Sequence, residues 1–234
     1  KNSYTYEDDS FVLHDPYKKG YSFVGWTEQN DEDPLKNYEL PKNSYGDKTF
    51  EAHWSANAYK VTFDVNGGNQ LADSTLEYTF DEFYYLPQPT RDGYSFEGWY
   101  IGTTRVYDGN WTIDSDVTLK ASWERTQYHI KYILNGGINN PQNPNGYTYD
   151  DETITLLPPT KKGYSFIGWT TEGVEEPVNA LKIEHNSTGN VTFEAHWAAN
   201  TYNITFDVNG GNALEENTLN QNSQIKNKIK RYNC

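Results

Sequence analysis

The stretch that decides the fold reads Gly-Tyr-Ser-Phe-x-Gly-Trp and occurs three times, at Gly20–Trp26, Gly93–Trp99 and Gly163–Trp169. Recurrence at this spacing predicts a tandem array of one small module of about seventy residues. Alternation of large and small side chains after the first Gly is typical of a half-buried strand. We expect the second Gly to form a β-bulge, because a bulge returns the Trp to the face of the Tyr and the Phe.

Two further strands are predicted to flank this stretch in the template repeat. An opening strand at Tyr59–Val65 alternates apolar and polar residues and ends at Asn66-Gly67-Gly68, which favours a tight turn. A closing strand at Val117–Trp123 ends on a second Trp. We expect the two Trp side chains of a repeat to meet in its core, where large aromatic residues bury much apolar surface. The predicted core residues are Tyr94, Phe96, Trp99, Trp123, Tyr164, Phe166, Trp169 and Trp197.

These patterns divide the chain into five segments. Residues 1–57 are predicted to be a partial repeat without its first strand, which we call the first repeat. Residues 58–126 and 127–200 are predicted to be complete repeats, called the second and third repeats. Residues 201–219 supply the first strand and turn of a truncated repeat, called the terminal segment. Residues 220–234 form a basic tail that we expect to be disordered, because it lacks the apolar pattern of the repeats.

Junctions between repeats are short and constant in length. Trp54 precedes Tyr59 by the same interval that separates Trp123 from Tyr128 and Trp197 from Tyr202. The junction peptides contain neither Gly nor Pro. A constant short junction is expected to hold one repeat against the next. The predicted fold class is therefore mainly β, with the modules arranged as an elongated, semi-rigid rod.

Composition restricts the partners of such a chain. The formal net charge of -14 disfavours nucleic acid and anionic membrane surfaces, because long-range repulsion opposes their approach. Cys234 is the single cysteine, so no repeat is closed by an internal disulfide. No apolar run reaches the length of a membrane span, and we expect this region not to be embedded in a membrane. The sequence begins inside a repeat, so an export signal or wall anchor would lie outside it.

The motifs resemble one known family. Tyr59–Gly68, Pro89–Trp99 and Val117–Trp123 look like the successive motifs of the Listeria–Bacteroides repeat, also called the internalin B-repeat. The resemblance covers both complete repeats and most of residues 1–57. It implies a small β-grasp-like module, in which an α+β arrangement is possible, found in arrays on exported bacterial surface proteins. It also implies an extracellular location at the cell envelope, a stalk or auxiliary adhesion role, no enzyme activity and no cofactor.

Candidate chemistry outside the resemblance is sparse. The chain has no nucleophile elbow, phosphate loop or His-Glu-x-x-His motif, so no catalytic residue is predicted. His53 and His196 lie two residues from Glu51 and Glu194, but one His and one Glu per repeat leave a zinc ion incompletely coordinated. The acidic runs 31–33 and 150–152 lack the spacing of a calcium loop. We therefore predict no metal site.

Two further hypotheses concern partners. Several aromatic residues outside the repeat pattern could form an exposed platform that stacks on a glycan or anchors a host protein, namely Tyr84, Tyr85, Tyr100, Tyr107 and Trp111. Direct ligand binding of this kind is the alternative to a passive spacer. We expect a monomer, but the opening strand at 201–212 could complete the strandless first repeat of another molecule by β-augmentation.

Overall fold

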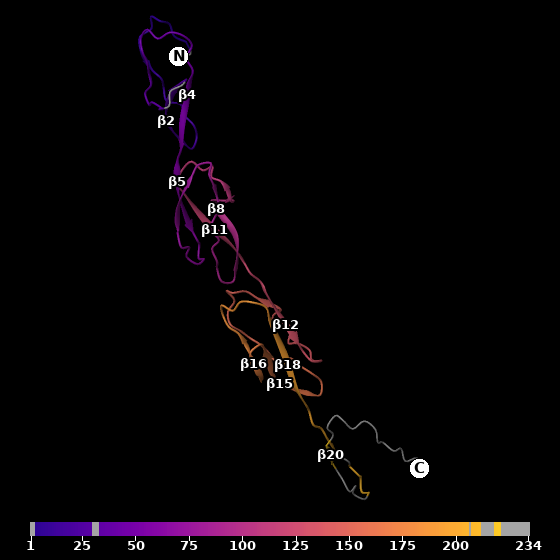
Figure 1. Ribbon diagram of the computed structural model, residues 1–234. Helices are drawn as coiled ribbons and strands as arrows, with labels where there is room; N and C mark the ends of the chain where they lie inside the picture. The colour runs from indigo at the N-terminus through magenta and orange to yellow at the C-terminus, as the bar shows by residue number, and fades with distance from the viewer. Residues whose placement is uncertain (1–2, 30–32, 206, 212–217, 221–234) are drawn as a thin grey trace. The chain divides into compact units, whose positions relative to one another are not determined.

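The computed structural model describes residues 3–29, 33–205, 207–211 and 218–220 (Figure 1). All regular elements in these residues are β-strands, which confirms the mainly β prediction; the α+β variant would need a helix, and none occurs there. It follows that none of the described residues forms a helix long and apolar enough to cross a bilayer. The β-grasp relationship stays a prediction. Contacts divide the described residues into two compact units, one ending at Glu124 and one beginning at Arg125.

The second repeat contains one five-stranded sheet and one small two-stranded sheet. The larger sheet has the order β6-β5-β11-β8-β9, in which β5 and β11 run parallel and β5–β6 and β8–β9 antiparallel. The smaller sheet pairs β7 with β10. The strands are β5 (Ala58–Asp64), β6 (Thr75–Thr79), β7 (Phe83–Tyr84), β8 (Tyr94–Ile101), β9 (Thr104–Val106), β10 (Gly109–Asn110) and β11 (Val117–Arg125).

The third repeat has the same architecture. Its sheet order is β13-β12-β18-β15-β16, and β12 and β18 again form the parallel pair. β14 and β17 form the small antiparallel sheet. The strands are β12 (Tyr128–Ile133), β13 (Gly146–Tyr147), β14 (Ile154–Thr155), β15 (Tyr164–Thr171), β16 (Val174–Val178), β17 (Lys182–Ile183) and β18 (Val191–Ala199).

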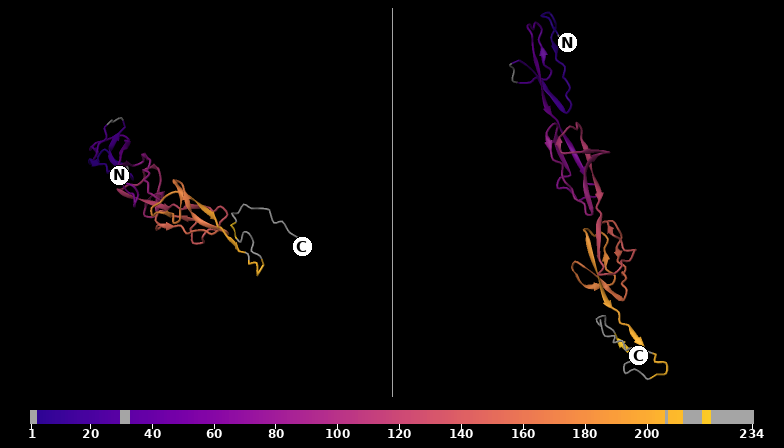
Figure 2. Two further views of the ribbon diagram at one scale, coloured as in Figure 1. Left: turned by 90° about the horizontal axis from the view of Figure 1, so that it is seen from below. Right: turned by 90° about the vertical axis from the view of Figure 1, so that its right-hand side faces the viewer.

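The first repeat lacks the parallel pair. Its strands are β1 (Phe11–Val12), β2 (Tyr21–Glu28), β3 (Glu39–Leu40) and β4 (Phe50–Ala56). β2 and β4 lie side by side in an antiparallel pair, as Figures 1 and 2 show. Among the described residues, β4 pairs with β2 alone. The terminal segment supplies β19 (Asn203–Thr205), which pairs antiparallel with β20 (Thr218–Asn220). The rest of the basic tail lies outside the described residues.

The predicted β-bulge occurs in the repeated stretch. Pairing passes from Phe23↔Trp54 directly to Gly25↔His53, so one extra residue lies on β2. The same shift separates Phe166 from Gly168 in β15. Because of the bulge, the Phe and the Trp share one face, and their rings meet edge to face at 5.4 Å in the first repeat and 5.3 Å in the third. The bulge prediction is therefore confirmed.

The two Trp residues of each repeat are connected through the Phe of the repeated stretch. The Phe96 ring lies 5.6 Å from Trp99 and 5.3 Å from Trp123, between centroids. In the third repeat the ring of Phe166 likewise lies 5.3 Å from Trp169 and 5.6 Å from Trp197. The Phe of the repeated stretch therefore connects the two indoles of a repeat; Phe96 meets Trp99 edge to face and Trp123 at a tilted angle of 60°.

The predicted core residues fall into three groups by burial. Trp99 and Trp169 are the largest fully buried side chains. A second group is half-buried and packs against the core, namely Phe96, Trp123, Phe166 and Trp197. The two tyrosines lie outside it. Tyr94 carries the guanidinium of Arg91 on its ring, and Tyr164 is 37% exposed beneath the ammonium of Lys161. Assigning Tyr164 to the core was wrong, because it is the first residue of β15 and pairs with Ala199, the last residue of β18, so it lies at the end of the sheet.

Candidate functional site

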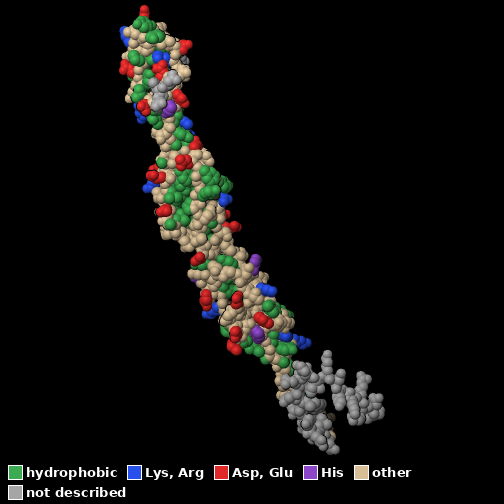
Figure 3. Space-filling view, viewed as in Figure 1, with side chains coloured by type: hydrophobic (Ala, Val, Ile, Leu, Met, Phe, Trp, Pro, Cys, Tyr) green, Lys and Arg blue, Asp and Glu red, His purple; other side chains and the backbone are tan. Residues whose placement is uncertain are grey.

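Only some of the residues predicted to form an aromatic platform are exposed. Tyr85 and Tyr107 are 78% and 70% exposed, and Phe83, which the sequence analysis missed, is 55% exposed. The Phe83 and Tyr85 rings meet edge to face at 5.0 Å. Alternation along Phe83-Tyr84-Tyr85 is the signal that could have found Phe83, because residues two apart share a face. Figure 3 shows apolar side chains gathered on one face of the second repeat.

Trp111 is a core residue, so its place in an exposed platform was wrong. The indole is 4% exposed and meets Tyr78 edge to face at 5.0 Å. The Tyr84 ring stacks on the Tyr78 ring, with 3.9 Å between the two centroids. In the first and third repeats, Leu40 and Ile183 are the buried residues on the equivalent short strands. In the second repeat Gly109 has that register, opposite Tyr84, and Trp111 is the buried residue two positions further along the chain.

Tyr100 and Tyr107 lie in different surroundings. Tyr100 is half-buried and lines a shallow hollow with Arg91 and Trp123. Tyr107 lies under the guanidinium of Arg105, with 5.0 Å between the guanidinium carbon and the ring centroid. The predicted set is therefore divided among the core, a small hollow and an exposed apolar surface.

The two histidines on the closing strands each contact a threonine hydroxyl on the neighbouring strand of the same sheet. The Nε2 atoms of His53 and His196 lie 2.8 Å from the hydroxyl oxygens of Thr27 and Thr170. Asp151 accepts a hydrogen bond from the backbone N–H of Thr148, and Asp150 forms an ion pair with Arg125. Across the part of the chain that the structure describes, no group of three or more His, Cys, Asp or Glu side chains is placed to hold a metal ion. Residues 31 and 32 of the other acidic run lie outside that part.

The opening strand closes the core of each complete repeat through its Asn-Gly-Gly turn. Trp123 Nε1 donates to the carbonyl of Val65 at 3.0 Å, and its ring covers Gly68 so closely that an added Cβ would lie 2.5 Å from it. Asn66 Nδ2 donates to the carbonyl of Ala121 on β11 at 3.0 Å. In the third repeat Trp197, Gly137 and Asn135 make the corresponding contacts with Leu134 and Ala195.

Hydrogen bonds join the first and second repeats, which belong to one compact unit. Asn57 is the centre of this contact: its N–H donates to the carbonyl of Gly20 at 2.9 Å, and its Oδ1 accepts from Ser22 Oγ at 2.6 Å. The carbonyl of Asn57 accepts from the N–H of Phe80 in the second repeat, also at 2.9 Å. One junction residue thus binds both repeats. Asn200 repeats two of these contacts at the end of the third repeat, with Gly163 and Ser165.

Side chains reinforce the same junction. The Phe80 ring lies directly on Gly20, where an added Cβ would come within 2.3 Å of it, so only Gly fits. Tyr21 meets Phe80 edge to face at 5.7 Å and donates its hydroxyl to Asp81 at 2.8 Å. This hydrogen bond raises the pKa of Tyr21 above its ordinary value. Lys19 adds an ion pair with Asp114 at 3.7 Å.

The first repeat contains a hollow of about 540 Å³, and apolar side chains that are core residues elsewhere border it. Tyr4, Phe11, Leu13, Leu40 and Phe50 form its apolar lining. Phe50 is only half-buried, whereas its counterparts on the other closing strands, Leu119 and Phe193, are 0% and 1% exposed. In the complete repeats these two counterparts pair with Phe63 and Tyr132 on the opening strands.

Comparison with known proteins gives one family match that covers most of the chain. The description of that family is Listeria-Bacteroides repeat domain, and the matched ranges are 1–53, 59–122 and 128–196. Two proteins of Evansella cellulosilytica are 31% and 32% identical over 87% and 83% of this chain; their names describe a Gly-rich membrane protein and a membrane protein. Internalin H of Listeria monocytogenes is 34% identical over 38% of the chain. The chain spans only 24%, 29% and 16% of these three relatives.

Proposed function

The chain belongs to the Listeria–Bacteroides repeat family, and from that premise we propose that it is the non-catalytic repeat region of a bacterial surface protein. In this role it acts as a semi-rigid stalk or spacer that carries other parts of the protein away from the cell envelope. The location is extracellular, at the cell surface. The role needs no cofactor, because it depends on the mechanical properties of the array.

The relatives support the location. Two carry names of membrane proteins and one is an internalin, and each contains much more than the part that matches. A repeat region that occupies a small share of a long envelope protein is suited to connecting its other parts. Any adhesive partner would then be bound chiefly by those other parts, with the repeats as an auxiliary element.

The observation that carries the spacer role is the junction around Asn57. A flexible linker would leave its backbone polar groups to water, whereas Asn57 uses its N–H, carbonyl and side chain in bonds to both neighbouring repeats. Phe80 adds apolar contact with Gly20 and Tyr21. Bending at this joint therefore requires the loss of several hydrogen bonds and one aromatic contact. Such a joint transmits orientation from one repeat to the next.

Distances between spin labels test this joint directly. Labels on Glu51→Cys and Lys120→Cys, in a Cys234→Ser background, report the separation of exposed sites in the first and second repeats. We expect a narrow distance distribution that broadens at least about twofold in Asn57→Gly, because Gly removes the side-chain bond and frees the backbone. Asn200→Gly is the matched control and leaves the distribution unchanged. Equal widths in the parent and in Asn57→Gly would contradict a stiff joint.

Direct binding is the second candidate, and one observation favours it. Phe83, Tyr85 and Tyr107 expose aromatic surface on the second repeat, and exposed aromatic rings stack on sugars or anchor proteins. Binding to a glycan array or to host-cell surface proteins should then fall at least about tenfold in the double variant Tyr85→Ala/Tyr107→Ala. Tyr17→Ala, which removes an equally exposed ring from the first repeat, is the control. Unchanged binding in the double variant would exclude this surface.

A further inference from the structure

We propose that Asn145 in the third repeat is a site of spontaneous deamidation, at which the chain converts its own side-chain amide to a carboxylate without an enzyme. The attacking group is the backbone nitrogen of the next residue, Gly146. The fold selects this position over two others that have the same Asn-Gly sequence. The inference goes beyond the spacer role and does not depend on it.

The reaction closes a five-membered ring and then opens it with water. Hydroxide removes the proton of the Gly146 nitrogen, which forms a bond to Cγ of Asn145, and the side-chain nitrogen takes a proton from water and leaves as ammonia. Water then cleaves one carbonyl–nitrogen bond of the succinimide ring. Cleavage at the side-chain carbonyl gives Asp, whereas cleavage at the backbone carbonyl gives isoaspartate, in which the chain continues through the side chain. Both products are ionised at neutral pH and add one negative charge.

The sequence restricts where this reaction can occur. A following Gly has no side chain to hinder its nitrogen, and in the two complete repeats Asn precedes Gly only at Asn66, Asn135 and Asn145. Asn140 and Asn143, close to the proposed site, each precede a Pro, whose nitrogen has no proton to lose. Those two residues therefore lack the nucleophile. Three positions remain, and their hydrogen bonds distinguish them.

The side chain of Asn145 is exposed, and no hydrogen bond to another described residue holds its amide. The chain bends at this residue, immediately before the two-residue strand β13 at the edge of the sheet. The carbonyl of Asn145 accepts from the N–H of Ile130 on β12 at 2.9 Å. Ring closure turns the peptide group after Asn145, so it has to break this bond. A short edge strand opens locally more readily than the centre of a sheet.

The nitrogen of Gly146 points away from the neighbouring strand β12. In an antiparallel pair, only alternate residue pairs exchange hydrogen bonds. Because Asn145 is bonded to β12, the next pair along the register, His129 and Gly146, is a non-bonded pair. The N–H of His129 agrees with this direction, since it donates to Asn190 Oδ1 on the opposite side of β12 at 2.8 Å. The nucleophilic nitrogen is therefore not occupied by the β12–β13 pairing.

Asn66 has the same following residue, but three hydrogen bonds hold it in place. Its Nδ2 donates to the carbonyl of Ala121 at 3.0 Å, and its own carbonyl accepts from the guanidinium of Arg91 at 3.3 Å. The turn around it is closed by the bond from the Gly68 N–H to the Val65 carbonyl at 2.9 Å. Ring closure moves both the side chain and the following peptide group, so it has to release all three contacts.

Asn135 is held by charged partners as well. Its Nδ2 donates to the carbonyl of Ala195 at 3.0 Å and to Glu194 Oε1 at 2.9 Å. Its carbonyl accepts from the ammonium of Lys161 at 2.7 Å. Hydrogen bonds with one charged partner are stronger than those between neutral groups. We therefore expect deamidation to be fastest at Asn145, slower at Asn66 and slowest at Asn135.

Conversion to isoaspartate changes the edge of the third repeat. It adds one methylene group to the backbone between Pro144 and Gly146 and removes from the main chain the carbonyl that accepts from Ile130. The adjacent carbonyl of Pro144, which accepts from the Tyr132 hydroxyl at 2.8 Å, has to shift with it. Ile130 and Tyr147 are core residues that this edge brings together. We expect isoaspartate to loosen β13 from β12.

Isotope labelling tests the site. The 234-residue chain is incubated at neutral pH in water labelled with oxygen-18, digested in ordinary water at acid pH, and the Asn-Gly peptides are analysed by mass spectrometry. We expect labelled acid to form at residue 145 at least about tenfold faster than at residues 66 and 135, because each further hydrogen bond that must break slows the reaction roughly fivefold. Equal rates at the three sites, or no labelled acid at residue 145, would overturn the proposal.

The unfolded chain is the matched control. In concentrated urea the hydrogen bonds of the folded repeats are lost, and the three sites should convert at rates within about threefold of one another. A tenfold advantage of residue 145 that persists in urea would show that the local sequence, and not the fold, selects the site. Asn145→Gln keeps an amide but requires a six-membered ring, so it should abolish conversion there and leave residues 66 and 135 unchanged.

Hydrogen exchange tests the structural consequence. The Ile130 amide should exchange at least about fivefold faster in the isoaspartate fraction, separated by chromatography, than in the fresh chain, because it has lost its acceptor. Asn145→Asp carries the new charge on an ordinary backbone and should keep the exchange rate of the parent chain within about twofold. Equal exchange in the isoaspartate fraction and the fresh chain would contradict the loosening of β13.

Discussion

The first and second repeats share the Gly-Tyr-Ser-Phe-x-Gly-Trp stretch, yet their cores differ. In the second repeat Trp99 is 1% exposed and Leu119 and Ala121 are buried. In the first repeat Trp26 and Phe50, which have the corresponding places, are only half-buried. Both have the bulged strand, the closing strand and the Phe between two indoles. The second repeat alone has the parallel strand β5.

This difference shows that the repeated stretch specifies the sheet but does not complete the core. Val61 and Phe63 on β5 fill the space over β11, and the turn after β5 receives the closing Trp123. Without an opening strand the same positions border a hollow. Completion of each module thus depends on a strand that precedes the stretch by about thirty residues, which is a long-range contact.

Truncation of the central Trp should give the largest effect. Trp99→Ala is expected to lower the free energy of unfolding of the second repeat by about 3–5 kcal/mol, because a fully buried aromatic side chain leaves a cavity. Trp26→Ala should cost about 1–3 kcal/mol, because that side chain is already partly exposed. Urea denaturation, monitored by hydrogen exchange of the amides in each repeat, measures the two losses in free energy of unfolding. Equal losses would contradict the comparison between the two cores.

Alkaline pH should separate the third repeat from the first. Burial raises the pKa of Tyr132 on the opening strand β12 to about 12. Below pH 10 both folded and unfolded chains keep this proton, so the contribution to stability is fully present. As the pH rises from 10 through 12 the unfolded chain ionises first, and about 2–3 kcal/mol is lost.

Tyr132→Phe should remove that part of the alkaline loss in the third repeat, although it also removes the hydrogen bond to the carbonyl of Pro144. Thermal unfolding at pH 9, 10, 11 and 12 compares the variant with the parent chain. Tyr17→Phe, at an 84% exposed position, is the control and should follow the parent chain. Parallel stability curves for Tyr132→Phe and the parent would show that Tyr132 is not shielded by the closed core.

A methyl group in the Asn-Gly-Gly turn should distinguish a closed module from an open one. Gly68→Ala places its Cβ 2.5 Å from the Trp123 ring and should cost about 1–3 kcal/mol, because the indole must move. Gly211→Ala, at the same place in the terminal segment, meets no indole and should cost less than about 0.5 kcal/mol. Chemical denaturation measures both, and similar losses would indicate that Trp123 has room to adjust.

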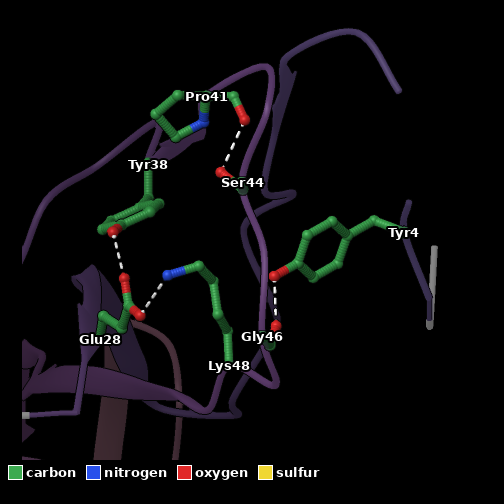
Figure 4. Close-up of polar contacts among 7 residues, drawn as sticks. All are labelled: Tyr4, Glu28, Tyr38, Pro41, Ser44, Gly46 and Lys48. Atoms are coloured by element: carbon green, nitrogen blue, oxygen red, sulfur yellow. Dashed lines mark hydrogen bonds and ion pairs between the residues drawn. The ribbon is translucent and has the colours of Figure 1, made fainter. Parts of the chain in front are cut away.

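The smallest expected effect is an acid dependence of the first repeat. The hydrogen bond that Glu28 accepts from Lys48 (Figure 4) lowers the pKa of Glu28 below its ordinary value. The resulting stability is present above the unfolded pKa and is lost as the pH falls through the folded pKa. Glu28→Gln should therefore flatten the acid side of the stability curve of the first repeat, followed by amide exchange between pH 3 and 6. An unchanged curve would mean that the ion pair contributes nothing measurable, as many surface pairs do.

Much of the fold was predictable because the repeats give the same evidence more than once. Three copies of Gly-Tyr-Ser-Phe-x-Gly-Trp indicated a bulged strand, since only a bulge brings Phe and Trp to one face, and the pairing of β2 and β15 has that shift. The opening strand and its turn were visible as alternation followed by Asn-Gly-Gly. The parallel pairing of the first and last strands was not visible, because residue alternation does not specify strand direction.

The candidate site was harder to predict, because exposure depends on loop register. Trp111 was predicted to be an exposed aromatic residue, but it packs in the core against Tyr78, beyond a short strand that carries Gly109 where the other repeats carry Leu40 and Ile183. Phe83 was not predicted, although it and Tyr85 are exposed while Tyr84 between them packs against the core, as alternation along a strand requires. The role of Asn57 was also missed, since a junction residue shows its bonds to both repeats only in three dimensions.

The most direct test of the central claim, that an opening strand closes each repeat, is hydrogen exchange of the closing strands. It compares β4 (Phe50–Ala56) with β18 (Val191–Ala199) in dilute protein. Amides of β4 that point away from β2 should exchange at least about tenfold faster than the corresponding amides of β18, because the latter are covered by the parallel strand β12. Equal protection of the two strands would contradict the claim.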